Sequence, residues 1–352
     1  MVVNDWIMVI HGPEVFDSGC ARHLIRVLHP RTVCAVGVMT RTAAEESGLT
    51  VEWRAGRPSE VISGLPAPAV LVTQGKTPET GRIFGEQVAG RHTAGGGLVQ
   101  LDCTAQTVFC WNGGDPDLAS RIAAATGWGI QAATANGRSP PHERIIRGCL
   151  PGETVCVEGV VIGRAVSDRV VLCQENGVVR AMEGLDPKPH GFEKLASLAP
   201  LNLEETWCTS GTLRRSSPRP SRTAPRCGRV AVIDHRGLDL YRRLDQDSCG
   251  VLAVGDDTTM VCGHICTHLG VPVFGITDGD GDVLLPGAYP PGSVVVELEG
   301  ERDDDVGREC ALVRPCREVC WDDWVEGTLA LLGDRARITV DLRAESDGLR
   351  PV

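Results

Sequence analysis

Acidic side chains gather in three short loops of the C-terminal third of the chain. GITDGDGD at 275–282, GDDTT at 255–259 and RDDDVG at 302–307 each come after an apolar run. Carboxylates this close repel one another unless a cation or protons neutralise them. Oxygen ligands suit hard divalent ions, and magnesium commonly bridges carboxylates to phosphate. We therefore predict an Mg²⁺ site, whose ligands are drawn from Asp256, Asp257, Asp278, Asp280, Asp303 and Asp304.

The residues beside these carboxylates favour an anionic ligand. Thr258 and Thr259 stand where a helix is expected to begin, so hydroxyls and helix amides would be available to a phosphate group. The D-x-D-x-D spacing also invites comparison with an EF-hand. That motif requires glycine and glutamate where Val283 and Tyr289 stand, so we reject it. The remaining alternative is that aspartate and glycine merely form solvated turns and helix caps.

Three residues of the N-terminal part are further candidates for ligand binding. Lys76 and Thr77 lie in VLVTQGKTPETG, at a junction of strand and helix, and the pair suits an anion. A phosphate-binding loop would need glycine at the position of Val70, so that motif fails. His11 ends the first predicted strand and suits acid–base chemistry, although a histidine that only hydrogen-bonds a turn is an equal alternative.

Cysteine and histidine offer a third kind of chemistry. In CGHICTH, Cys262 and Cys266 share one helix face, while His264 and His268 share another, so the four do not readily grip one ion. A thiolate cluster of Cys310, Cys316 and Cys320 is a second alternative, although no CxxC spacing supports it. The 15 cysteines are scattered and odd in number, so we expect reduced thiols.

The elements that must position these residues predict an α/β protein. Short apolar strands alternate with helical stretches from residue 6 to about 138 and again after residue 228, which predicts two Rossmann-like parallel-sheet layers. Between them the apolar period changes to two, which predicts a small β-rich insert with a short helix near 191–199. The predicted parts are 1–142 (α/β), 143–211 (β-rich), 212–228 (an Arg/Pro/Ser-rich linker or crossing segment) and 229–352 (α/β with the acidic loops).

Charge and composition exclude several classes of protein. The net charge of -11 disfavours a nucleic-acid partner, although the arginines of 212–228 form a local basic stretch. No apolar run is long enough for a membrane span, and the first residues do not have the pattern of a signal peptide. We therefore expect a cytoplasmic protein whose partner is a small phosphorylated molecule.

Several motifs together resemble an uncharacterised archaeal family found mainly in methanogens. They include VIHGPEVFDSG, GKTPETGRIFG, PGETVCVEGVVIGRA, ENGVVRAMEG, GDDTTMVCG and GITDGDGD, and the resemblance spans nearly the whole chain. It implies no particular activity. The stretch RVAVIDHRGLDLYRRL followed by GVLAVGDDTT is also similar to thiamin-pyrophosphokinase-like proteins, which bind nucleotides or diphosphates beside carboxylates.

Two functional hypotheses follow. One is an enzyme of phosphoryl or diphosphoryl transfer, which relies on positioning and charge neutralisation. The other is a non-catalytic sensor or assembly factor that binds a nucleotide or coenzyme unchanged.

Overall fold

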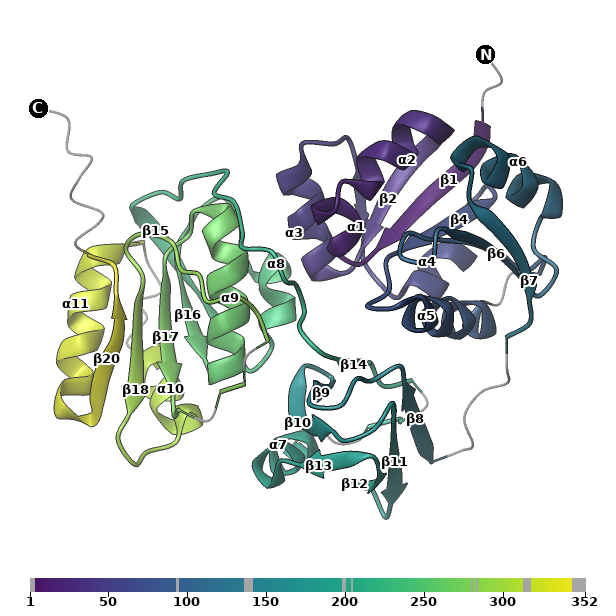
Figure 1. Ribbon diagram of the computed structural model, residues 1–352. Helices are drawn as coiled ribbons and strands as arrows, with labels where there is room; N and C mark the ends of the chain where they lie inside the picture. The colour runs from purple at the N-terminus through teal and green to yellow at the C-terminus, as the bar shows by residue number, and fades with distance from the viewer. Residues whose placement is uncertain are drawn as a thin grey trace, which may run out of the picture. The chain divides into compact units, whose positions relative to one another are not determined.

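The computed structural model describes residues 4–92, 95–135, 142–197, 201–203, 205–279, 281–282, 284–312 and 318–343. The chain divides into two compact units. The first comprises Met1–Glu153, Arg164–Pro187 and Ala196–Thr206, and the second comprises Thr154–Gly163, Lys188–Leu195 and Trp207–Val352. Each unit contains a parallel-rich sheet covered by helices, so the architecture is mixed α/β (Figure 1).

The first unit is built on a seven-stranded sheet with the order β3-β2-β1-β4-β5-β6-β7. Its strands are β1 (Asn4–His11), β2 (Pro30–Val36), β3 (Glu52–Arg54), β4 (Ala69–Thr73), β5 (Leu98–Asp102), β6 (Thr107–Trp111) and β7 (Gly129–Ala133). Strands β1 to β5 are parallel to their neighbours, but β6 runs antiparallel to β5. The parallel part explains the alternating pattern of the sequence, and the β5–β6 hairpin departs from it.

Helices cover both faces of this sheet. They are α1 (Glu14–Asp17), α2 (Cys20–Leu28), α3 (Val38–Ser47), α4 (Pro58–Ser63), α5 (Pro78–Arg91) and α6 (Pro116–Thr126). A hydrophobic core lies on each face of the sheet, and alternate residues of β1 point into one core or the other. Met8 packs with Leu24 of α2 and Leu118 of α6 on one face. Val9 packs with Val88 of α5 on the opposite face. Burial on both faces is what makes these strands nearly continuous apolar runs.

An antiparallel sheet of three strands also belongs to the first unit. It has the order β12-β11-β8 and contains β8 (Glu143–Arg147), β11 (Arg169–Glu175) and β12 (Val178–Glu183). Asn176 and Gly177 join the last two strands with positive φ angles of 51° and 82°. Such angles are typical of the two-residue hairpin turn predicted from ENG. The short strand β13 (Leu185–Pro187) follows in the same unit.

Short strands and one helix open the second unit. Strand β9 (Thr154–Val157) pairs antiparallel with β14 (Cys208–Ser210), and β10 (Val160–Ala165) follows β9 after a tight turn. Helix α7 (Pro189–Ser197) lies close to the range expected from the sequence. This part of the chain supplies one side of the pocket described below.

The main sheet of the second unit has six strands in the order β19-β15-β16-β17-β18-β20. The strands are β15 (Cys227–Asp234), β16 (Ser248–Val254), β17 (Val273–Thr277), β18 (Val294–Leu298), β19 (Val319–Cys320) and β20 (Ala336–Asp341). The four central strands are parallel, and the two edge strands run antiparallel to their neighbours. All four carboxyl ends of the central strands therefore point to one edge of the sheet.

Helices also cover both faces of this sheet. They are α8 (Leu240–Arg243), which follows the short 3-10 turn η1 (Gly237–Asp239), α9 (Asp256–Leu269), α10 (Asp303–Leu312), and α11 (Trp321–Leu332), which precedes the 3-10 turn η2 (Gly333–Arg335). Val254 and Ile276 pack with Val306 of α10 and Trp324 of α11. Helix α9 contacts β16 and β17, and the absent side chain of Gly275 leaves room for Thr259.

Two sequence interpretations are corrected here. The acidic stretch RDDDVG follows the end of β18 as expected, but Asp303–Gly307 form the start of helix α10 and not a loop. The sequence CREVCWDDWVEGTLALLG at 316–333 has the pattern of one helix, but its described part begins with β19 before α11. In both cases tertiary contacts with the sheet override a weak local pattern.

The arginine-rich segment 212–228 is hydrogen-bonded to the C-terminal end of α9. The backbone amide of Ser221 donates to the carbonyl of His268, and that of Ala224 donates to Gly270. At the end of this segment, Cys227 faces Cys320 across β15 and β19 and forms a disulfide with it, which corrects the expectation that all thiols are reduced. Within the described ranges, no helix combines the length and apolar character needed to cross a bilayer.

Candidate functional site

Three aspartates converge at the carboxyl edge of the second sheet. Asp256 begins α9 directly after β16, Asp278 follows β17, and Asp303 begins α10. Each offers a carboxylate oxygen, and the three oxygens lie within 4.8 Å of one another. The amide of Asp278 donates to Asp256 Oδ2 at 3.0 Å, which holds the two loops together. Carboxylates from three separate parts of the chain are thus placed as ligands of one hard cation would be.

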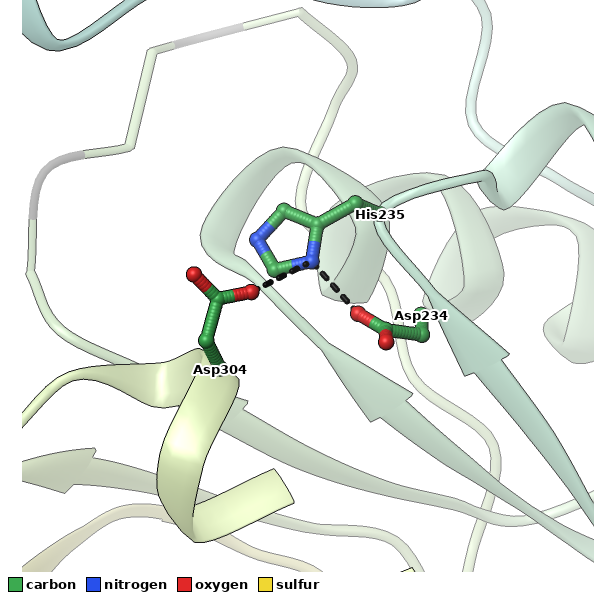
Figure 2. A group of neighbouring side chains, drawn as sticks. All are labelled: Asp234, His235 and Asp304. Carbon is green, nitrogen blue, oxygen red and sulfur yellow. Dashed lines mark hydrogen bonds and ion pairs between the residues drawn. The ribbon is translucent and has the colours of Figure 1, made fainter. Parts of the chain in front are cut away.

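A histidine lies beside this acidic cluster. His235 follows β15, and its Nδ1 is 2.6 Å from Asp234 Oδ1 and 3.5 Å from Asp304 Oδ1 (Figure 2). Its other ring nitrogen, Nε2, is 3.5 Å from Asp303 Oδ2. The imidazole therefore has carboxylates on two sides. It links Asp234 and Asp304 to the acidic cluster through Asp303.

The electrostatics of this corner are set by mutual neutralisation. Burial lowers the pKa of His235, but the carboxylates of Asp234, Asp303 and Asp304 outweigh it and raise that pKa to about 9. Burial raises the pKa of Asp303, but His235 and Lys194 together bring it below its usual value. Without a cation, the protonated imidazole thus compensates part of the negative charge.

A pocket opens beside these residues, entirely within the second unit. The hollow spans about 390 Å³ of space, which includes open solvent at its mouth. The lining next to the acidic cluster is formed by His235, Gly255, Asp256, Asp257 and Thr258, of which Asp256 belongs to the cluster. The rest of the lining comprises the β9–β10 turn at 159–161 and, around α7, Lys188, His190, Gly191 and Lys194. A hollow lined by both carboxylates and basic side chains suits an anion bound together with a cation.

Asp257 and Thr259 are placed differently from the acidic cluster. Asp257 Oδ1 accepts from the amide of Asp282 at 3.3 Å, and Asp282 in turn forms an ion pair with Lys188 at 3.2 Å. Thr259 is buried against the sheet, while Thr258 lines the pocket. Of the six predicted metal ligands, Asp256, Asp278 and Asp303 come together, Asp304 joins His235, and Asp280 lies outside the described residues.

The three candidates of the first unit have contacts that explain them structurally. His11 Nδ1 lies 2.8 Å from the carbonyl of Val36, and its ring stacks on Phe84 with 4.9 Å between centroids. Lys76 forms an ion pair of 2.5 Å with Glu153. Thr77 caps α5, because its hydroxyl accepts from the amide of Thr80. Their role in ligand binding stays a prediction.

The cysteine-rich motif of α9 is buried. Burial raises the pKa of the Cys262 and Cys266 thiols, and a raised pKa disfavours the thiolate that metals bind. His268 Nδ1 lies 3.1 Å from the carbonyl of Arg219, which ties the ring to the crossing segment. Cys320 forms a disulfide with Cys227, so it has no free thiolate for the cluster considered with Cys310 and Cys316. Cys316 lies outside the described residues.

Sequence reasoning missed the lysines of the pocket and the histidine. His235 stands in VIDH at the end of a strand, which is the same signal that singled out the aspartates. Lys188 and Lys194 do not belong to any recognisable binding motif. They are nevertheless two of the three lysines in the chain, and this scarcity was the available signal.

Comparison with known proteins places the chain in a family. Residues 8–312 match the family described as "Uncharacterized protein conserved in archaea (DUF2117)". The "Uncharacterized protein MJ0065" of Methanocaldococcus jannaschii is 30% identical over 325 residues, which cover 86% of this chain and 89% of that protein. The chain therefore belongs to this archaeal family, as the sequence motifs indicated.

One solved structure is also similar in part. It is described as "Substrate-directed dual catalysis of dicarbonyl compounds by diketoreductase", with 12% identity and a TM-score of 0.22 over 39% of this chain and 66% of that chain. A similarity this low supports no conclusion about fold or function. The resemblance to thiamin-pyrophosphokinase-like proteins is not shown by these comparisons.

Proposed function

We propose that the second unit binds a phosphate-bearing small molecule, such as a nucleotide or coenzyme, together with a divalent cation. The observation that carries the proposal is that carboxylates and lysines line the same pocket. Asp256 and the carboxylates behind it would hold the cation, while Lys188 and Lys194 would face the anion. Phosphate and a divalent ion are the common pair of ligands that needs both kinds of side chain within one hollow.

The helix that begins at the acidic cluster favours phosphate as the anion. Helix α9 spans 14 residues and begins at the pocket with Gly255 as its N-cap, whose φ is 100°. The amides of its first turn and the Thr258 hydroxyl add donors, and the helix dipole favours negative charge there. Lys194 also lies close enough to influence the pKa of Asp303. A cation and a phosphate could therefore share this corner without leaving either charge unmatched.

The strand order supports the same location. In the first unit the order β3-β2-β1-β4-β5 reverses between β1 and β4, as in Rossmann-like layers. In the second unit the parallel order β15-β16-β17-β18 places four carboxyl ends at one edge. We infer that both layers are Rossmann-like, and ligands of such layers lie beyond the carboxyl ends of the strands.

Binding is tested on the full-length protein by calorimetry with ADP, ATP, pyrophosphate and inorganic phosphate, each with and without MgCl₂ or MnCl₂. We expect at least one phosphate compound to bind, and to bind more tightly with the cation. Loss of a charged hydrogen-bond partner costs about 1.5–3 kcal/mol, so Lys194→Gln should weaken binding on the order of tenfold or more. Arg308→Gln removes an equal charge from an exposed position in the same unit and should change little.

Incubation of the bound compound separates the two hypotheses on activity. Release of phosphate or transfer to an acceptor, lost in Lys194→Gln, would support phosphoryl or diphosphoryl transfer. A compound that binds with the cation and stays intact over hours would support the sensor. If no phosphate compound in the panel binds under any metal condition, the proposed function is wrong.

A further inference from the structure

Two buried atoms at the edge of the acidic cluster face each other without a hydrogen bond. They are His235 Nε2 and Asp303 Oδ2, which lie 3.5 Å apart, and neither finds a hydrogen-bond partner among the described residues. The Asp303 side chain is only 2% exposed. Buried polar atoms are normally hydrogen-bonded, whereas these two make only a long ion pair with each other, which leaves both able to contact one ligand.

The separation of these atoms fits coordination to one cation. Nitrogen and oxygen ligands lie about 2.1 Å from a first-row metal ion, so two ligands of one ion are about 3.0 Å apart in an octahedral site and 3.4 Å in a tetrahedral one. The observed 3.5 Å is close to this range. A hydrogen bond with good geometry would normally bring the same atoms nearer, to about 2.9 Å.

The surroundings leave the ring little freedom to turn away. Asp234 lies 2.6 Å from Nδ1 (Figure 2) and fixes the proton on that nitrogen. The other nitrogen, Nε2, then faces Asp303. A carboxylate behind a histidine ring is the usual support of a metal-binding imidazole. On the other side, a side chain at Gly255 would lie 3.1 Å from His235 Nε2 and 3.6 Å from Asp303 Oδ2. Glycine therefore preserves the space around both atoms.

We propose that His235 coordinates, through Nε2, the same cation that Asp256, Asp278 and Asp303 hold, with Asp234 as a positioning residue. The inference rests on the cation of the proposed function and changes its chemical class. Imidazole suits iron or zinc better than magnesium, whose ligands are almost all oxygen. The resident ion is thus a first-row transition metal rather than Mg²⁺.

The test uses the full-length protein loaded with one equivalent of Mn²⁺ alone and examined by pulsed electron paramagnetic resonance. Direct coordination by imidazole gives a ¹⁴N coupling at the manganese, and we expect that coupling in the wild-type protein. His235→Gln should remove it and weaken Mn²⁺ binding by tenfold or more. His23→Gln changes an exposed histidine of the other unit and should retain both.

Asp234→Asn tests the positioning role. We expect it to keep the ¹⁴N coupling and to weaken Mn²⁺ binding by about tenfold, since supporting carboxylates typically contribute 10–100-fold. Circular dichroism without metal shows whether each variant is folded. The ¹⁴N coupling in the wild-type resonance spectrum is measured without any variant. The proposal can therefore be tested even if a variant fails to fold.

Manganese that binds stoichiometrically to the wild-type protein with no ¹⁴N coupling would overturn the proposal and leave His235 as an internal counter-ion. So would a protein that binds no Mn²⁺, Fe²⁺ or Zn²⁺. Failure of the proposed function is a separate outcome, in which the ¹⁴N coupling is present but no phosphate compound binds.

Discussion

Neutralisation of one carboxylate in the acidic cluster should stabilise the protein without metal and abolish its response to metal. The perturbation is Asp278→Asn, which keeps the shape of the side chain and removes its charge. Carboxylate oxygens of Asp256 and Asp303 lie within 4.8 Å of that of Asp278. Two charges at that distance repel by about 0.9 kcal/mol in water and about 3.5 kcal/mol at an effective dielectric of 20.

The net effect should fall toward the lower end of that range. His235 already supplies positive charge next to Asp303, and Asp278 is half-buried rather than enclosed. We expect Asp278→Asn to stabilise the metal-free protein by about 1–2 kcal/mol, which corresponds to a rise in melting temperature of roughly 2–6 °C. A cation at 100 times its Kd stabilises the wild type by about 2.7 kcal/mol. The variant should lose most of that gain.

Differential scanning calorimetry with EDTA and with MnCl₂ measures both effects on one protein. Asp305→Asn is the control, because Asp305 lies in the same first turn of α10 but is exposed and outside the cluster. A variant that melts lower than the wild type in EDTA, yet gains as much from Mn²⁺, would show that the three carboxylates neither repel strongly nor share a cation.

Two further predictions concern the packing of the sheets. Burial lowers the pKa of His11, so the folded state binds its proton less readily than the unfolded chain, and the associated stability is complete above about pH 6.5 and is lost as the pH falls. His11→Asn should therefore lose less stability than the wild type between pH 8 and pH 5, by up to about 1.4 kcal/mol per pH unit, in urea unfolding. Gly250→Ala should lower the free energy of unfolding by about 2 kcal/mol or more in the same assay, because the added methyl group would collide with the buried ring of Trp321.

Each of these predictions has a matched control. His23→Gln removes an exposed histidine and should leave the pH profile unchanged; an identical profile for His11→Asn would mean that burial of the ring has no cost. Gly327→Ala places a methyl group in open space on α11 and should stabilise that helix by about 0.5–1 kcal/mol. Equal stability of both glycine variants would contradict the packing argument.

The parallel-rich layers were predictable because their strands are buried on both faces. Strands buried on both faces need apolar residues at nearly every position, and the sequence shows them as short apolar runs such as WIMVI and GVLAV. The hairpin at ENG was predictable for a different reason, since Asn and Gly tolerate positive φ. Helix α10 was not, because its acidic first turn and low apolar content resemble a loop until the helix packs on β16.

The sequence by itself determined which strands end in carboxylates, and the carboxyl-end rule was enough to single out Asp256 and Asp278. Only the tertiary structure decided that Asp303 and His235 join them, and that Lys188 and Lys194 line the pocket beside them. Local patterns record burial and turn geometry within a few residues. The distance between side chains far apart in the chain depends on strand order and helix packing, which no local pattern encodes.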